Sequence, residues 1–234
     1  MQLRIDIHSH TNLDPVDGLQ GNKTVKYSVE DACKQAKKYH IDVLAFTHHN
    51  KLIITKEMNT IAKKYNILLL PGFEATIEGK HVVLINPTTD NITTFAQLKT
   101  EKEHNPKLLV FAPHPYYPGK DALQNKLIKH INLFDCIEYC HFYFSWCNPF
   151  NKKAKKVAKQ YTKPLIATSD AHSLEGFGLS STIVTVTEKT TDAIIQAIKD
   201  NKVTIQSEPP SLRYMIKTFI NVARFVRIFG RKRI

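Results

Sequence analysis

The amino-acid sequence predicts an α/β fold, with a mainly parallel sheet closed as a barrel. Short apolar runs alternate with helical patterns from one end of the chain to the other, which is the order expected of repeated strand and helix units. The 234 residues are enough for one complete barrel, and they show no internal repeat and no low-complexity linker. We therefore expect one main domain.

The strands are predicted from apolar runs bounded by turn residues, and the helices from apolar residues at helical spacing. The expected strands are residues 2–8, 42–47, 67–71, 81–85, 108–112, 135–139, 164–168 and 182–186. The expected helices are residues 28–40, 54–65, 93–104, 121–132, 150–161 and 190–200. Ser28 with Asp31, Asn151, and Thr190 or Thr191 stand where the first, fifth and sixth of these helices are expected to begin.

One compositional break divides the chain. In "SEPPS", residues 207–211, two prolines end the preceding strand and allow a new helix to begin. We expect a barrel domain over residues 1–208 and a basic amphipathic helix over residues 209–234. Of the net charge of +12, the tail contributes +7 without any acidic residue, and the remaining body contributes +5.

The composition predicts a soluble globular protein without a transmembrane span, because 42% of the residues are hydrophobic and no apolar run approaches 18 residues. The first residues, MQLRIDIHSH, lead straight into a strand and carry no apolar signal-peptide region, so a cytoplasmic location is expected. The cysteines lack paired spacing, and we expect reduced thiols. They are Cys33, Cys136, Cys140 and Cys147.

Candidate metal ligands follow the expected strands, at the point where each strand stops. On a strand, side chains two residues apart leave the same face, so His8 and His10 are expected to point together, and Asp170 and His172 repeat their spacing. Because loops at the carboxyl ends of barrel strands meet at one face, these side chains are expected to converge. The other members of the set are His48 and His49 after the second strand, Glu74 after the third, and His114 after the fifth.

His81 opens a strand instead of closing one. The connection "EATIEGKH" from Glu74 to His81 is too short for a crossover helix and carries a Glu-Gly turn signal, so a hairpin is expected to return His81 beside Glu74. A donor set this rich in imidazole suits zinc, manganese or iron better than calcium or magnesium. The donors are numerous enough for two or three such ions.

A known family shows the same motifs. In this order and spacing, "DIHSHT", "FTHHN", "PGFEA", "GKHVVL", "APHP" and "TSDAH" resemble the polymerase and histidinol phosphatase (PHP) superfamily of metal-dependent phosphoesterases. The resemblance runs from about residue 2 to residue 205 and omits the tail. It implies a distorted (β/α)7, TIM-like barrel with a cluster of up to three metal ions.

Carried onto this chain, the resemblance implies three sets of ligands. The first ion would be held by His8, His10, Glu74 and Asp170. Glu74 would also bridge to a second ion bound by His81 and His114, and the third ion would take Asp17, His49 and His172. Catalytic roles are expected for Asp170, Glu74 and His172.

Three neighbouring positions are interpreted separately. "FTHHN" has His48 where the family usually has Asp, so His48 either weakens the third site or contacts the substrate phosphate. Asp6 matches the "DxHxH" pattern and is expected to hold a ligand histidine. Asp14 matches no position of the family and is interpreted as a turn residue.

The expected function is hydrolysis of a small-molecule phosphate monoester by a metal-bridging hydroxide. The first alternative is a nuclease or exonuclease that cleaves nucleic-acid phosphodiesters. Against it, Lys greatly outnumbers Arg in the body, and we find no interleaving of aromatic and basic residues of the kind that tracks single strands. The second alternative is a catalytically inactive binding module, which would have no reason to retain nine ligands.

The tail has two interpretations. In the first, the helix buries its apolar side on the barrel or in a homo-oligomer interface. In the second, its basic stripe binds nucleic acid or an anionic membrane surface. The apolar side comprises Leu212, Met215, Ile216, Phe219, Val222, Ala223, Val226 and Phe229, and the basic stripe comprises Arg213, Lys217, Arg224, Arg227 and Arg231.

Overall fold

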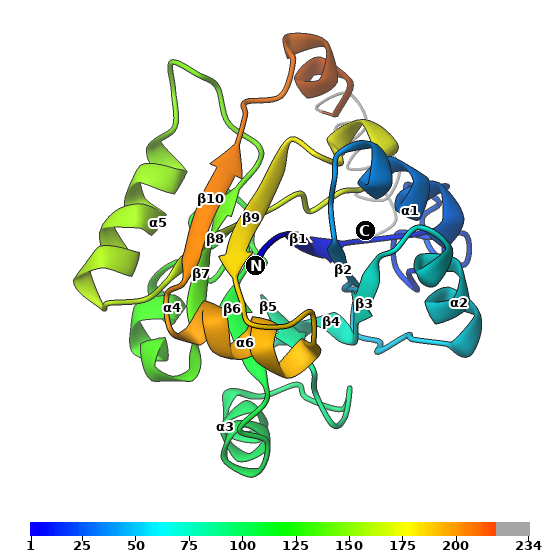
Figure 1. Ribbon diagram of the computed structural model, residues 1–234. Coiled ribbons are helices and arrows are strands. Elements are labelled where there is room, and N and C mark those ends of the chain that lie inside the picture. Colours follow the sequence, from blue (N-terminus) through cyan, green and yellow to red (C-terminus); the bar gives the residue numbers. More distant parts are fainter. Residues whose placement is uncertain (219–234) are drawn as a thin grey trace, which may run out of the picture.

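The computed structural model describes residues 1–218, and in this part of the chain ten strands form two five-stranded sheets (Figure 1). In spatial order, the first sheet consists of β10 (Val203–Ser207), β9 (Ser180–Thr185), β1 (Gln2–Ser9), β2 (Val43–Phe46) and β3 (Leu68–Leu70). The second consists of β4 (Gly72–Ile77), β5 (Lys80–Ile85), β6 (Leu109–Ala112), β7 (Cys136–Cys140) and β8 (Leu165–Thr168). Strands β1 to β3 and β6 to β8 pair in parallel, whereas β9 and β5 pair antiparallel with both of their neighbours.

The α/β class is confirmed, whereas closure into a single barrel is not, because the hydrogen-bonded ladders form two separate sheets. Two isolated bridges, Ser9 with Ala171 and His49 with Glu74, join the sheets at one end. Apolar side chains from both sheets share one core. At the opposite end, where β9 pairs with the start of β1, helix α6 (Thr191–Lys199) adds its isoleucines to that core (Figure 1).

The helices form near the predicted positions, because their start signals are local. Ser28 begins the first helix through a capping box with Asp31, and Thr190 begins α6 by accepting the N–H of Ala193. The predicted helix 121–132 is shorter, as α4 followed by a 3-10 turn. Besides α6, the elements are α1 (Val29–Lys38), α2 (Lys56–Lys64), α3 (Phe95–His104), α4 (Asn125–Lys129), α5 (Pro149–Gln160), and the 3-10 turns η1 (Ile131–Leu133) and η2 (Leu174–Gly176).

Asn151 does not begin α5, contrary to the prediction. The helix starts two residues earlier at Pro149, a residue that suits the first helical position because its missing N–H needs no partner there. Asn151 is buried instead, and its side chain accepts from the N–H of Cys140 at 2.9 Å and donates to the Cys140 carbonyl at 2.8 Å. These two bonds anchor α5 to the end of β7.

Strand β1 is irregular where it approaches its carboxyl end. Asp6 pairs with Leu44 and Ser9 pairs with Phe46, so three steps along β1 match two steps along β2. An extra residue of this kind breaks the alternation of side chains and re-aims them. The alternation of side chains along β1 is therefore interrupted between Asp6 and Ser9, while His8 and His10 still point together, as predicted.

The chain continues as a helix over residues 212–218, and the buried side chains there are Tyr214 and Met215. Leu212 and Ile216, which were predicted on the apolar side, are 66% and 49% exposed. The rest of the predicted tail helix, with most of its basic stripe, lies outside the described residues.

Within residues 1–218, none of the helices combines the length and the apolar character needed to cross a membrane.

Candidate metal centre

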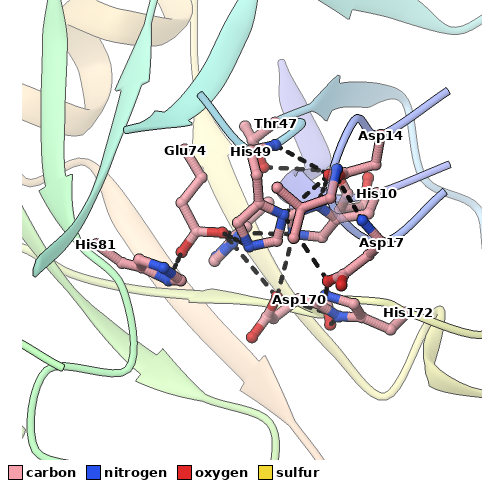
Figure 2. Close-up of polar contacts among 12 residues, drawn as sticks. His10, Asp14, Asp17, Thr47, His49, Glu74, His81, Asp170 and His172 are labelled. Atoms are coloured by element: carbon pink, nitrogen blue, oxygen red, sulfur yellow. Dashed lines mark hydrogen bonds and ion pairs between the residues drawn. The ribbon is translucent and has the colours of Figure 1, made fainter. Parts of the chain in front are cut away.

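The nine predicted ligands form one cluster where the two sheets meet, and Figure 2 shows most of them. Each side chain lies within ion-pair distance of at least one other member. The hairpin prediction is confirmed, because β4 and β5 pair antiparallel and bring Glu74 and His81 together. His8 lies in β1 and His10 just after it, His49 follows β2, His114 follows β6, Asp170 and His172 follow β8, and Asp17 lies between β1 and α1.

Glu74 lies at the centre of the cluster and is almost completely buried. Its Oε1 faces two imidazoles, at 2.9 Å from Nδ1 of His81 and 3.4 Å from Nε2 of His114. Its Oε2 faces the Nε2 atoms of three others, at 3.2 Å from His49 and 3.6 Å from both His8 and His10. The two oxygens of one carboxylate thus face two different groups of histidines.

Asp170 brings a second carboxylate to the same point. Its Oδ1 lies 3.3 Å from Nε2 of His8 and 3.5 Å from Nε2 of His10. Its φ angle is +43°, and that of His114 is +29°, a region that residues other than glycine rarely adopt. Such conformations persist where surrounding contacts fix them, and they gather at functional sites.

Asp14 does more than form a turn, so its interpretation needs correcting. Its Oδ1 accepts the N–H groups of Val16 and Asp17, as a turn residue would. Its Oδ2, however, lies 2.7 Å from Nδ1 of His10 and 3.0 Å from Nδ1 of His49. Holding Nδ1 of both rings leaves Nε2 of both to face Glu74.

Glu138 holds His8 in the same way, although it was not among the predicted site residues. This residue of β7 is fully buried, and its Oε1 lies 2.8 Å from Nδ1 of His8 and accepts from the Thr168 hydroxyl. Its Oε2 accepts the N–H of His114. The only signal in the sequence is one acidic residue inside an apolar strand, "CIEYC", where burial without partners would be costly.

Asp6 and His48 do not have the expected contacts. The Oδ1 of Asp6 accepts the N–H of Ser169, so it fixes the backbone next to Asp170, while Glu138 holds the His8 ring. His48 is fully buried, stacks on Phe46, and lies 2.8 Å from the Thr11 hydroxyl. Burial lowers the pKa of His48 to about 3, so a neutral ring is expected there, and the geometry does not support a phosphate contact.

The electrostatic field of the cluster favours cations. Burial alone would raise the pKa of Glu74, but the surrounding imidazoles outweigh it and hold the pKa well below the usual range. Burial alone would lower the pKa of His8, but the charges of Asp170, Glu138 and Glu74 outweigh it and raise the pKa well above the usual range. For His172, burial is likewise outweighed by the hydrogen bond to Asp17, and the pKa rises to about 10. The carboxylates therefore attract positive charge to a buried position.

The donor set fits metal ions. Among residues 1–218, Nε2 of His8, Nε2 of His10 and Oδ1 of Asp170 are buried polar atoms without a hydrogen-bond partner, and all three point toward one another. Such atoms are costly unless something binds them. Three sets of donors have ligand atoms within 4.8 Å of one another: His8, His10 and Glu74; His49, Glu74 and His81; and His10, His49 and His172.

The comparison with known proteins agrees with the motifs. A family model described as PHP-associated matches residues 148–203, which include Asp170 and His172. A two-domain protein from Bacteroides vulgatus containing a predicted PHP-like metal-dependent phosphoesterase has the same fold, with a TM-score of 0.69. In its motifs, in this matched segment and in its fold, the chain is similar to PHP-type proteins. The likeness to the Bacteroides PHP-like protein has 17% identity and covers 89% of this chain and 65% of that one.

Two further solved structures share the fold of this chain. PsfC from Pseudomonas syringae has a TM-score of 0.65 and 13% identity, over 96% of this chain and 99% of that one. The lesion-specific endonuclease EndoQ from Pyrococcus furiosus has a TM-score of 0.61 and 17% identity, over 88% of this chain and 58% of that one. At these identities the likeness concerns the fold. No curated protein matches the chain significantly.

Proposed function

We propose that the chain is a metal-dependent phosphoesterase that hydrolyses phosphate monoesters. The observation that carries this proposal is the buried Glu74 carboxylate, whose two oxygens face two different groups of histidines. On a fold shared with metal-dependent phosphoesterases, such a dense set of imidazole and carboxylate donors suits two or three divalent transition metals.

The proposed ligand sets follow the motifs of the family. One ion would be held by His8, His10, Glu74 and Asp170, a second by Glu74, His81 and His114, and a third by Asp17, His49 and His172. The nitrogen-rich donors favour zinc, manganese or iron. When bound, such ions neutralise charge on a phosphoryl group and make water acidic enough to supply hydroxide near neutral pH.

The residues of the chain also define the side from which a substrate enters. The His172 side chain is 33% exposed, whereas those of Asp17 and Asp170 are 16% exposed and that of Glu74 is buried. Nε2 of His172 lies 3.0 Å from Asp17 Oδ2, and its Nδ1 lies 3.0 Å from the Asp170 carbonyl, so the ring is fixed from both sides. We assign His172, the most exposed of these residues, to the side from which the substrate reaches the centre, and Glu74 and Asp170 to hold the centre.

A nuclease is the second candidate, because one of the similar structures is an endonuclease. The two candidates differ in the number of free oxygens on the phosphate. A monoester presents three oxygens to a cluster of up to three ions, whereas a diester presents two. The cluster therefore favours the monoester.

The two candidates are separated by parallel assays on the purified full-length protein. Metal content would be measured first, and hydrolysis rates would then be compared for an aryl phosphate monoester, a bis-aryl phosphate diester and an unlabelled oligonucleotide. We expect bound transition metal and faster hydrolysis of the monoester. Faster hydrolysis of the diester and internal cleavage of the oligonucleotide would establish the nuclease instead, and a metal-free protein without any activity would refute both.

A further inference from the structure

The loop between β7 and α5 presents a stacked aromatic pair to solvent. It forms a tight turn in which Phe144 and Cys147 exchange two backbone hydrogen bonds, and Figure 1 shows it projecting beyond the start of α5. Trp146 is 80% exposed, and its ring stacks on Phe144 with centroids 5.1 Å apart and planes inclined by 23°. Phe144 covers one face of the indole, and the large exposed fraction leaves the other face to solvent.

The helix that follows carries an unpaired basic stripe. No acidic residue occurs between Glu138 and Asp170, whereas six lysines do. Four of these are exposed and share one face of α5, because they stand at positions i, i+3, i+4 and i+7. Within residues 1–218, none of the four makes an ion pair or a side-chain hydrogen bond. They are Lys152, Lys155, Lys156 and Lys159, and we call them the α5 lysine stripe.

The aromatic pair and the α5 lysine stripe are fixed to the metal centre through β7. Glu138 of this strand holds His8. At the end of the strand, the side chain of Asn151 in α5 hydrogen-bonds both the N–H and the carbonyl of Cys140. The Tyr117 hydroxyl donates to the carbonyl of Phe142, which ties the loop to the segment after His114. The surface and the cluster are therefore linked through hydrogen bonds to β7 and to the loop that follows it.

We propose that this surface binds a single nucleic-acid strand, with a base stacked on Trp146 and phosphates along the α5 lysine stripe. The stripe covers seven steps of helix, or roughly 10 Å, which is long enough to contact successive phosphates. An indole face accepts any unpaired base, and lysines supply charge without sequence preference. This proposal rests on the proposed function, because it takes the bound strand to carry the phosphate ester that is hydrolysed at the cluster. Aromatic and basic residues do not alternate in the sequence here, because they occur in two consecutive segments, the loop and α5, that folding places side by side.

A strand fits this surface better than a lipid bilayer does. Shallow insertion into a bilayer needs an apolar face at the level of the basic residues. Here Trp146 stands between the exposed residues Ser145 and Cys147. The exposed residues of α5 are mostly lysines, with Phe150, 36% exposed, in its first turn. A duplex fits less well, because its bases are already stacked and paired.

Trp146 reports directly on its own occupancy, because it is the only tryptophan of the chain. The full-length protein would be titrated at low salt with a 12-nucleotide thymidine strand, and in parallel with vesicles of phosphatidylserine and phosphatidylcholine. We expect the strand to quench the tryptophan emission and added salt to reverse the quenching. Emission that shifts to the blue with vesicles and is unaffected by the strand would show that the surface binds membranes, and would overturn the proposal.

Variants then test the two halves of the surface by anisotropy of a fluorescein-labelled strand. Trp146→Ala should weaken binding roughly 10- to 100-fold, with Trp146→Phe recovering part of the loss. Lys152→Glu combined with Lys156→Glu should reduce the slope of log affinity against log salt by about 1.4, at about 0.7 per lost phosphate contact. The matched control is Lys63→Glu with Lys64→Glu on α2, which is also exposed and remote from β7. If the α5 and α2 double variants lost the same affinity for the strand, a specific binding surface on α5 would be refuted.

Hydrolysis of a small aryl phosphate separates this proposal from the proposed function. Trp146→Ala should keep the parental rate, because Trp146 lies outside the cluster. If the parent hydrolyses the aryl phosphate but its tryptophan does not respond to the strand, only the strand-binding proposal fails. If the strand binds and the aryl phosphate is not hydrolysed, only the proposed function fails.

Discussion

Asp14 and Glu138 determine how three ligand imidazoles are oriented. Glu138 contacts Nδ1 of His8, and Asp14 contacts Nδ1 of both His10 and His49, so that Nε2 of all three rings faces Glu74. Imidazoles fixed in this way present a lone pair at a defined point, which raises affinity for a metal ion.

We expect Asp14→Asn to lower metal affinity by roughly 10- to 100-fold, because the amide is uncharged and replaces one acceptor oxygen by an NH₂ donor, either toward the two imidazoles or toward the backbone N–H groups of Val16 and Asp17. Chelator competition on the purified variant would measure this. The control is Asp90→Asn, since Asp90 accepts from Lys51 and the Leu52 N–H at a distance from the centre. Unchanged metal affinity in Asp14→Asn would mean that Asp14 has no orienting role.

Glu74→Gln should be more damaging than Asp17→Asn. Glu74 faces five imidazoles, whereas Asp17 contacts His172 and His49 at the exposed side. We expect Glu74→Gln to lose most bound metal and nearly all aryl phosphate hydrolysis, and Asp17→Asn to retain roughly two ions with a lower rate. Metal content and hydrolysis rate, measured on the same preparations, would test whether Glu74→Gln is the more damaging change. Equal metal loss in both variants would contradict this prediction.

Most of the nine residues of the cluster could be predicted from the sequence because they stand in short local motifs at the ends of strands, whereas His81 opens a strand and Asp17 was expected from the resemblance. The roles of Asp14 and Glu138 could not be predicted, since each also contacts a histidine that is distant in the chain. Asp14 reaches His49 across 35 positions, and Glu138 reaches His8 across 130. Such pairs depend on strand register and on the bulge in β1, neither of which a hydrophobic pattern specifies.

At the scale of the elements, apolar runs located eight of the ten strands within residues 1–218 but not their partners, and β4 and β10 were not among the predicted strands. The predicted segment 182–186 is strand β9, yet β9 and β10 pair antiparallel and extend the first sheet. A hydrophobic run identifies a buried strand without indicating its direction. Only the β4–β5 hairpin could be predicted, because its turn signal is local and its connection is short.

Asn151→Ala should loosen α5 from β7. The change removes both bonds to Cys140 and leaves a buried N–H and a buried carbonyl without partners, at a cost of roughly 2–3 kcal/mol. Denaturant unfolding would measure the loss. Asn59→Ala is the control, because that exposed side chain bonds one carbonyl on its own helix and its removal should cost less than about 0.5 kcal/mol. A similarly small loss of unfolding free energy in Asn151→Ala would contradict the role of Asn151 in anchoring α5 to β7.

For the whole molecule, metal binding should contribute to folding, because the ligands come from both sheets. Ligand present at 1,000 times its dissociation constant stabilises a folded protein by about 4 kcal/mol. For a chain of this length that corresponds to roughly 10 °C in Tm, so chelation should lower Tm by about that amount. Calorimetry with and without chelator would test it, and Glu74→Gln should show little difference between the two conditions.

The two ends of the paired sheets are held together by different forces, polar contacts at one end and apolar packing at the other. At one end the sheets are joined by two bridges and by polar side chains of the cluster. At the other, the isoleucines of α6 close an apolar core, and apolar burial weakens on cooling while ionic contacts do not share that heat-capacity dependence. Cold should therefore loosen the α6 end first, and acid should loosen the cluster end first. Which end of the paired sheets opens first thus depends on whether the protein is cooled or acidified.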